Sequence, residues 1–303
     1  MNFVRLCGCK GRRSCLACEA SFNLPRKDYF ASLKAFNSYA FCYKCKKLYP
    51  GWDAHQVIFD HHKHRPADGL DNPGICVFGN FLDMWEAEKV LDSLERTNWS
   101  TSQSGRRKQN FGPIVNFKKM KIAVGDFVGF PLYAKFIHER LRAYPKLENF
   151  CPIEQCALDY NPEKGASIDP HIDDCWVWGD RVATVNCCGD SVLTLTKYKG
   201  DCYKYNLEFA ASSGCITGTA DTLQNHTTMR DWNDIVIRIL MPELSLVVLH
   251  GPARYQFEHT ILREDILERR ICLTFREFSS PFKLGGDQYG IGKLIAAKAS
   301  QFW

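Results

Sequence analysis

The second half of the chain is divided into short segments rich in β-branched and aromatic residues, and this pattern limits the fold more than any other feature. Turn-forming residues separate these segments. The pattern predicts strands at residues 153–160, 182–187, 191–196, 235–240, 245–250 and 271–275. Many short strands of this kind favour an antiparallel sandwich or barrel of the jelly-roll type.

Helices are predicted around this β-rich region. Asp83 can cap a helix that extends to Leu94, and a second helix is expected from Pro131 to Leu141, each with one apolar face. Residues 200–233 are polar and interrupt the strands, so we expect an inserted loop there. The chain should end in a helix over residues 289–302. The predicted class is therefore α+β, with a jelly-roll core and flanking helices.

Cysteine usage indicates a reducing compartment. The chain has fifteen Cys, an odd number, and six of them fall in the first fifty residues. The first ten residues lack the apolar run of a signal peptide, and no apolar run is long enough to span a bilayer. We therefore expect a protein of the cytoplasm and nucleus that uses no membrane, whose cysteines bind metal or pack in the core. The net charge of +5 permits a polyanionic partner without requiring one.

Four N-terminal cysteines have the spacing of a metal site. Cys7, Cys9, Cys15 and Cys18 form Cys-x-Cys-x5-Cys-x2-Cys. Four thiolates so close together suit a closed tetrahedral zinc site, which could fold a segment too short to fold alone. An iron–sulfur cluster and a reduced tail without metal are the alternatives.

A second group of metal-ligand residues follows. Cys42 and Cys45 precede His61 and His64 in a pattern similar to a zinc finger. The two-residue gap between the histidines is shorter than usual, so a solvated loop is the preferred interpretation.

A His-x-Asp pair at His171 and Asp173 offers one imidazole and one carboxylate. On a strand, residues two apart leave from the same face and can reach one ion. His259, beyond a later strand, can supply a third ligand. Two histidines and one carboxylate leave open coordination positions, which suits non-haem Fe(II) with a chelating cosubstrate and dioxygen. The spacing alone also fits a surface turn.

Two arginines lie six residues apart on a predicted strand. Arg270 and Arg276 would therefore share one face, and Ile271, Leu273 and Phe275 would share the other. Inward-facing arginines need an anion, because burying an unpaired charge is costly. A dicarboxylate such as 2-oxoglutarate is a suitable partner. An edge strand with solvated arginines is the alternative.

In their order along the chain, His171, Asp173, His259, Arg270 and Arg276 resemble the AlkB family of Fe(II)- and 2-oxoglutarate-dependent dioxygenases. The resemblance covers about residues 75–280. It implies that the two histidines and Asp173 are the catalytic iron ligands, that Arg270 binds the distal carboxylate of 2-oxoglutarate, and that Arg276 and Tyr160 also bind the cosubstrate. The family usually has Asn two positions before that tyrosine, where this chain has Leu158.

Composition and the resemblance together divide the chain into five parts. Residues 1–50 would be a Cys-rich metal-binding module and 51–73 a linker. Residues 74–145 would form a substrate lid with its helical support. The double-stranded β-helix core, which is the jelly roll of these enzymes, would occupy 146–280 and the final helix 281–303.

The N-terminal cysteine motif, the SQSGRRKQ run and the DPHIDD segment resemble one animal branch of the family, the fourth homologues. That branch implies demethylation of monomethyl-lysine on actin, with a role in actomyosin organisation and cytokinesis. The family as a whole implies methylated nucleic acid, with N6-methyladenine in DNA or RNA as the leading choice. Candidate substrate residues are Arg106, Arg107, Lys108, Trp176 and Trp178. An oxygenase that leaves a stable hydroxylated product and an inactive Cys-rich adaptor are the remaining alternatives.

Overall fold

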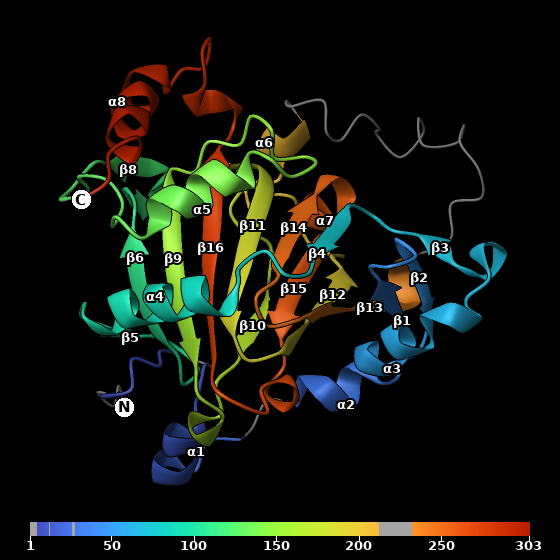
Figure 1. Cartoon of the computed structure of the whole chain (residues 1–303). Coiled ribbons are helices and arrows are strands. Elements are labelled where there is room, and N and C mark those ends of the chain that lie inside the picture. Colours follow the sequence, from blue (N-terminus) through green and yellow to red (C-terminus); the bar gives the residue numbers. More distant parts are fainter. Residues whose placement is uncertain (1–4, 12, 26–27, 212–231) are drawn as a thin grey trace.

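The computed structural model describes residues 5–11, 13–25, 28–211 and 232–303, and two seven-stranded sheets form its core (Figure 1). The first sheet has the order β10 (Ile168–His171), β15 (Phe257–Ile261), β12 (Ser191–Lys197), β13 (Ile235–Met241), β1 (Asn37–Cys42), β2 (Lys47–Pro50) and β3 (Leu70–Asp71). The second has the order β4 (Ile75–Phe78), β14 (Leu246–His250), β11 (Trp178–Cys188), β16 (Arg270–Phe278), β9 (Glu154–Tyr160), β6 (Arg107–Phe111) and β5 (Ser100–Thr101). A separate hairpin joins β7 (Ile114–Asn116) and β8 (Lys121–Ala123).

Apolar side chains from the two sheets meet in one core. Leu195 and Ile237 of the first sheet belong to the same buried cluster as Val247 and Cys272 of the second. Burial of such surface contributes about 25 cal/mol per Å², so this layer accounts for much of the stability. The strands predicted from the sequence are present, and the jelly-roll prediction is confirmed.

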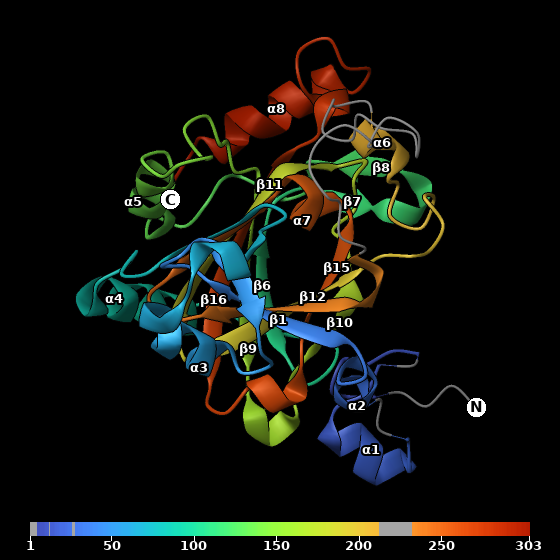
Figure 2. The same cartoon turned by 90° about the vertical axis from the view of Figure 1, so that its right-hand side faces the viewer.

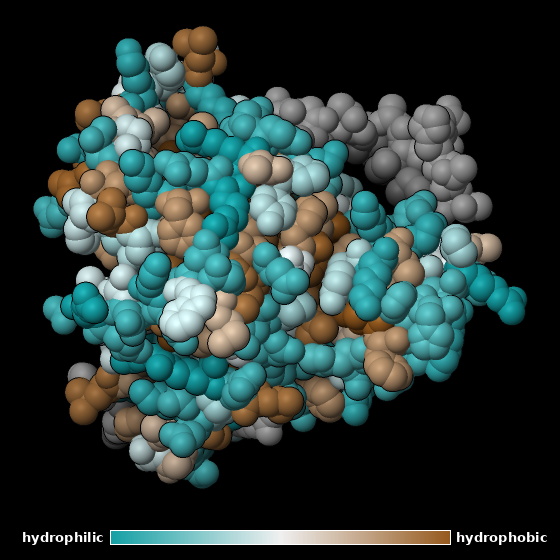
Figure 3. Space-filling model, viewed as in Figure 1, coloured by the Kyte–Doolittle hydropathy of each residue, from teal (hydrophilic) through white to brown (hydrophobic). Residues whose placement is uncertain are grey.

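Helices cover the outer faces. Figure 1 shows α4 (Met84–Glu95) and α5 (Ala134–Leu141) lying across the second sheet, where both contribute to a buried cluster with Leu273 and Phe275. Asp83 and Glu86 form the capping box at the start of α4. The predicted closing helix is present as α8 (Tyr289–Ala299). Figure 3 shows hydrophilic and hydrophobic residues interspersed over this side of the molecule. Among the helices of the described residues, none is long and apolar enough to cross a membrane.

The N-terminal region is organised differently from the sequence-based expectation. Residues 37–50, assigned to the Cys-rich module, form two strands of the core, and β1 pairs in parallel with the distant β13. Residues 51–73, assigned to a linker, contain α3 (Ala54–Phe59), the 3-10 turns η1 (Asp60–Lys63) and η2 (Pro66–Asp68), and β3. These elements are short and pair with partners far along the chain, so they leave little local periodicity.

The remaining short helices lie near the ends of the sheets. Figures 1 and 2 both place α1 (Leu16–Phe22) at the lower end of the molecule, and Figure 1 shows α2 (Tyr29–Leu33) separated from it across the lower part of the molecule. The predicted insert at 200–233 begins with a turn that leads into α6 (Glu208–Ala211); residues 212–231 of the insert lie outside the described part of the chain. The helix α7 (Gly251–Tyr255) connects β14 to β15.

Candidate metal and cosubstrate site

Two antiparallel strands bring the candidate metal ligands together. His171, the last residue of β10, is the direct cross-strand partner of His259 on β15. The ring centroids of the two imidazoles are 4.2 Å apart. Asp173 follows two residues after His171, and one ligand atom from each of the three side chains lies within 4.8 Å of the others. The convergence predicted from the His-x-Asp spacing is therefore present.

The electrostatics of the three groups suit a cation. Burial lowers the pKa of His171, and burial together with the neighbouring His171 lowers the pKa of His259 to about 3. Both rings are therefore neutral, as metal binding requires. The Nδ1 atom of His171 lies 2.9 Å from the backbone carbonyl of Asp169, which can only accept, so Nε2 is left for a metal. Burial opposes ionisation of Asp173, but Arg276 and the two histidines hold the pKa of this carboxyl well below its usual range.

Arg276 orients the candidate metal carboxylate. Its Nε and Nη2 atoms donate to the two oxygens of Asp173 at 3.0 and 3.1 Å. Its Nη1 atom donates to Glu154, the residue directly opposite it on β9, at 2.6 Å. The guanidinium thus bridges two carboxylates and lines the cavity that holds the three candidate metal-ligand side chains. Arg276 supports the ligand set as well as facing the expected cosubstrate.

Arg270 lies deeper in the same cavity and has a different environment. Its side chain is 1% exposed, and its Nε donates to the amide oxygen of Asn186 at 2.8 Å. The guanidinium lies 5.0 Å from the ring centroid of Tyr160, its cross-strand partner on β9. Among the described residues, no carboxylate forms an ion pair with Arg270. A buried guanidinium with this surplus charge suits the carboxylate of a bound ligand.

The residues present therefore fit the cofactors that the sequence implies. The ligand set of His171, Asp173 and His259 is the kind used for non-haem Fe(II), and it occupies one end of a cavity whose other end holds Arg270. Residues of β16 alternate as predicted: Arg270, Cys272, Thr274 and Arg276 line the cavity, and the intervening residues pack under α4 and α5. The strand is central in its sheet, which rules out the edge-strand alternative.

An outer cleft adjoins the candidate metal ligands, and some of the predicted substrate residues line it while others do not. Arg106 and Lys108 line this cleft together with Trp178, which lies 5.8 Å from the Arg276 guanidinium. Arg107 leaves the opposite side of the strand and pairs with Asp159 at 2.5 Å. Trp176 is buried against Phe282 and does not line the cleft, although it belongs to the same apolar cluster as Trp178. Period-two alternation thus separates Arg107 from its neighbours, and Trp176 is a core residue.

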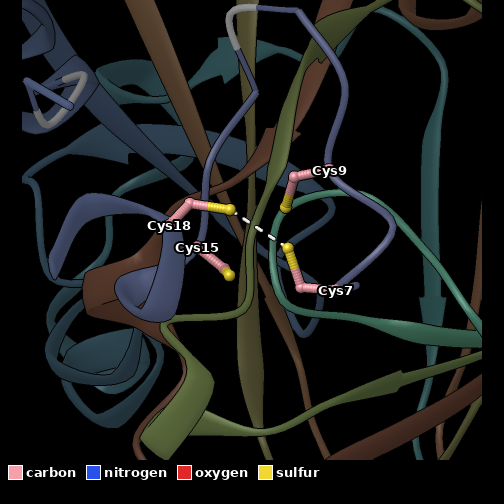
Figure 4. A group of neighbouring side chains, drawn as sticks. All are labelled: Cys7, Cys9, Cys15 and Cys18. Carbon is pink, nitrogen blue, oxygen red and sulfur yellow. Dashed lines mark hydrogen bonds between the residues drawn. The ribbon is translucent and has the colours of Figure 1, made fainter. Parts of the chain in front are cut away.

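The four N-terminal cysteines also converge. Figure 4 shows the side chains of Cys7, Cys9, Cys15 and Cys18 turned toward one another, and their sulfur atoms lie within 4.8 Å of each other. The Sγ atoms of Cys7 and Cys18 are 3.0 Å apart. Burial acts against ionisation of Cys7, but hydrogen bonding with the Cys18 thiol, helped by Cys9 and Cys15, lowers its pKa to about 7. The group has the geometry of a closed four-thiolate site.

The cysteine cluster lies against the catalytic sheets. Arg13, in the loop between Cys9 and Cys15, pairs with Asp169 at 3.4 Å and lines the outer cleft. Glu19 on α1 accepts two hydrogen bonds from Arg263, at 2.7 and 2.9 Å. The cysteine loop therefore forms part of the cleft wall. Its partner Asp169 precedes the candidate metal ligand His171 by two positions.

Comparison with known proteins relates the whole chain to one group of enzymes. The chain is 35% identical to the human alpha-ketoglutarate-dependent dioxygenase alkB homolog 4 over 99% of its length and 95% of the relative. The mouse protein of the same name is 34% identical over 100% of the chain and 96% of the relative. This chain belongs to the AlkB family of 2-oxoglutarate-dependent dioxygenases. It is therefore an enzyme.

Two further proteins show more distant similarity to the chain. A Caenorhabditis elegans protein named DNA N6-methyl adenine demethylase is 30% identical over 93% of the chain and 90% of the relative. Among solved structures, the alpha-ketoglutarate-dependent epimerase SnoN covers 69% of the chain with a TM-score of 0.42 and 10% identity, over 79% of its own length. No family model matches the chain.

Sequence reasoning missed three residues around the AlkB-type site. Asn186 holds Arg270 and donates from its amide to the carbonyls of Gly189, Met241 and Pro242 at 2.7 to 3.0 Å. Glu154 pairs with Arg276, and the buried Arg254 donates to the carbonyl of Asp173 at 2.9 Å. Asn186 and Glu154 stand in no motif. Arg254 lies within the GPARYQFEH segment that leads to His259, where its position beside the metal ligands could have been expected.

Proposed function

We propose that this AlkB-family enzyme removes N-methyl groups by oxidation, with His171, Asp173 and His259 as the iron ligands and Arg270 as the principal cosubstrate residue. The convergence of the three ligand side chains in one cavity with a buried, unneutralised arginine carries this proposal. When bound, iron and 2-oxoglutarate reduce dioxygen and supply the oxidant that hydroxylates the methyl carbon. The hydroxymethyl group leaves as formaldehyde, with succinate and carbon dioxide as the other products.

The side chains of the protein would position these reactants. Arg270 would hold the far carboxylate of 2-oxoglutarate, with Tyr160 against one side of the guanidinium and Asn186 fixing its Nε. Arg276 would keep Asp173 ionised and correctly oriented for the metal. The apolar residues Leu193, Val247 and Leu249 line the same cavity and would limit access of water.

As the substrate we propose monomethyl-lysine in a protein, with actin as the protein implied by the resemblance to the fourth homologues. The outer cleft combines the aromatic residues Trp178 and Tyr205 with the carboxylates of Asp169 and Asp174. A methylammonium group is stabilised by aromatic faces and by nearby negative charge. Such an enzyme would act on actomyosin organisation and cytokinesis, in the cytoplasm and nucleus.

N6-methyladenine in DNA or RNA is the second candidate substrate. The Caenorhabditis elegans relative carries that activity in its name. The same cleft is lined by Lys10, Arg13, Arg106 and Lys108, which could contact phosphates. In this case turnover should fall steeply with salt, and replacement of Arg106 and Lys108 by Ala should weaken that dependence.

The two substrates are separated by parallel assays of formaldehyde and succinate. Purified enzyme is given an actin peptide with monomethyl-lysine, a methyladenine oligonucleotide, and the unmethylated form of each. We expect equal amounts of formaldehyde and succinate with the methylated peptide, and none from the His171→Ala variant. Formaldehyde from the oligonucleotide alone would transfer the assignment to the second candidate. Methyl-dependent succinate without formaldehyde would indicate stable hydroxylation.

We also propose a structural zinc ion for Cys7, Cys9, Cys15 and Cys18. The convergence of four thiols at the cleft wall supports it, because such a site can order a segment with few apolar residues. The zinc content of the full chain should fall by one equivalent in the Cys15→Ser variant. If the analysis finds iron and inorganic sulfide instead of zinc, the four cysteines hold an iron–sulfur cluster and the zinc assignment is wrong.

A further inference from the structure

A second group of thiols and imidazoles lies far from the AlkB-type site, at the turn between β1 and β2. Cys42 ends β1, and Cys45 stands three residues later in the turn. The backbone N–H of Lys46 donates to the carbonyl of Cys42 at 2.7 Å, and Lys46 has a left-handed φ of 58°. This tight turn presents both thiols on the same side, which is the arrangement of a Cys-x2-Cys zinc knuckle.

The opposite side of the group comes from the 3-10 turn η1. His61 lies within this turn and His64 immediately follows it. In a 3-10 helix residues three apart lie almost directly above one another, whereas an α-helix needs a spacing of four for the closest match. The short gap that favoured a solvated loop in the sequence is therefore explained by the type of turn. His64 contacts the hairpin through its side chain, and His61 through its carbonyl.

The side chains of Cys42, Cys45 and His64 meet. One ligand atom from each lies within 4.8 Å of the others, and Cys45 Sγ is 3.4 Å from His64 Nδ1. Cys42 is fully buried, and the His64 ring stacks on Tyr49 of β2 with a centroid distance of 3.7 Å. The three donors are held by packing before any ion binds.

We propose that Cys42, Cys45 and His64 bind a zinc ion that is separate from both the iron site and the N-terminal cysteine cluster. Two thiolates and an imidazole are the ligands that zinc prefers in structural sites. The fourth position is open to His61, whose carbonyl already contacts Cys45 Sγ at 3.9 Å, or to solvent. This assignment rests on the local geometry alone and does not depend on the proposed substrate.

The ion would join the 3-10 turn to an exposed end of the first sheet. The hairpin β1–β2 lies between β13 and the short strand β3 in the first sheet. Residues of α3, including Val57 and Ile58, pack against β1 in the same buried cluster as Cys42. Since η1 directly follows α3, a metal link from Cys45 to His64 would hold this helix on the sheet. The site is therefore structural, and it adds a metal link to the apolar packing of this region.

Metal analysis of the full-length, iron-loaded chain tests the proposal. Zinc content is compared in wild type and in the Cys45→Ser and His64→Asn variants, with His62→Asn as the matched control because His62 is exposed and outside the group. We expect each of the first two variants to lose one zinc equivalent relative to wild type, and the control to lose none. Unchanged zinc content in Cys45→Ser would overturn the assignment. The N-terminal cluster is intact in every variant, so its own metal does not affect the difference.

A second measurement uses only wild-type protein, in case the variants fold poorly. After zinc is exchanged for cadmium-113, NMR distinguishes four-sulfur sites from sites with two sulfurs and nitrogen by chemical shift. We expect a resonance of the two-sulfur type. A cadmium-loaded, folded chain that gives only a four-sulfur resonance, or none, would refute the site at Cys42, Cys45 and His64.

Discussion

The guanidinium of Arg276 holds both carboxylate oxygens of Asp173, at 3.0 and 3.1 Å. The two residues are 103 positions apart in the chain, and the ion pair is buried from solvent. A metal ligand with both oxygens already hydrogen-bonded cannot rotate freely, so its orientation is fixed before iron binds. Glu154 accepts a hydrogen bond from the remaining Nη1 atom, so the guanidinium itself is held on both sides.

Replacement of Arg276 by Lys should weaken iron binding while the fold is kept. An ammonium group cannot reproduce the paired contact with Asp173, because it lacks the planar fork of a guanidinium. Groups that support metal ligands typically contribute 10- to 100-fold to affinity, so we expect a loss of about that size. Anaerobic titration with Fe(II) measures it. Arg269→Lys, at a pair with Glu95 and Asp159 near the surface, is the matched control and should retain wild-type iron affinity.

Arg270→Met should separate cosubstrate binding from iron binding. Loss of one partner of a buried charge pair costs about 3–5 kcal/mol, which corresponds to more than a 100-fold increase in the KM for 2-oxoglutarate. Without cosubstrate the variant should be more stable than wild type, because a buried charge has been removed. Thermal unfolding with and without 2-oxoglutarate checks both effects. Arg181→Met, which breaks a pair with Glu277 on β16, should instead lower stability and leave the KM unchanged.

The sequence predicted the site better than it predicted the N-terminal part of the fold. Arg270 and Arg276 on β16 obey the period-two rule of strands, which determines the side of a sheet that a residue occupies. That rule holds wherever the strand pairs, so these positions could be derived without knowledge of the neighbouring strands. His171 ends β10 and Asp173 lies two residues later, and the two side chains still converge. The same rule applied to residues 106–108 would have separated Arg107 from the cleft.

The features that the sequence did not predict involve residues whose partners are distant in the chain. Strand β1 pairs with β13, and its few residues have no periodicity long enough to identify a strand of the core. Trp176 lies in a turn that ends where β11 begins at Trp178, so period two does not relate the two side chains. Trp176 packs on Phe282 near the C-terminus, and Trp178 lines the cleft. Asn186 is a lone buried amide whose role appears only when Arg270 is placed beside it. Such information resides in tertiary contacts.

Glu19→Gln should release the N-terminal cysteine loop from the cleft wall. The paired hydrogen bonds between Glu19 and Arg263 are partly shielded from water, and a hydrogen bond to a charged group contributes about 1.5–3 kcal/mol. Hydrogen exchange in α1 should accelerate by about 10- to 100-fold, since this contact opposes local opening. Glu163→Gln, an exposed change in the neighbouring turn η4 (Pro162–Lys164), should leave the exchange unaltered. Equal protection of α1 in Glu19→Gln and wild type would contradict this role for the ion pair.

His138 should make the fold sensitive to acid at a point remote from the metal site. Its side chain is 5% exposed on α5, its Nε2 has no hydrogen-bond partner in the described residues, and its ring lies 4.6 Å from that of Phe130 and 5.3 Å from that of Phe275. Burial lowers the pKa of His138 to about 3, from an ordinary value of 6.5. The unfolded chain therefore binds a proton below pH 6.5 that the folded chain excludes.

His138 therefore does not reduce the free energy of unfolding above pH 6.5. As the pH falls from 6.5 toward 3, the free energy of unfolding decreases by about 1.4 kcal/mol for each pH unit. His138→Leu fits an apolar environment and removes the titrating group, so the variant should lose less stability than wild type over that interval. Urea unfolding at several pH values measures the difference between the two proteins. The acid sensitivity of His171 and His259 is common to both and cancels. Parallel loss of stability in wild type and variant would show that His138 is already protonated in the folded enzyme.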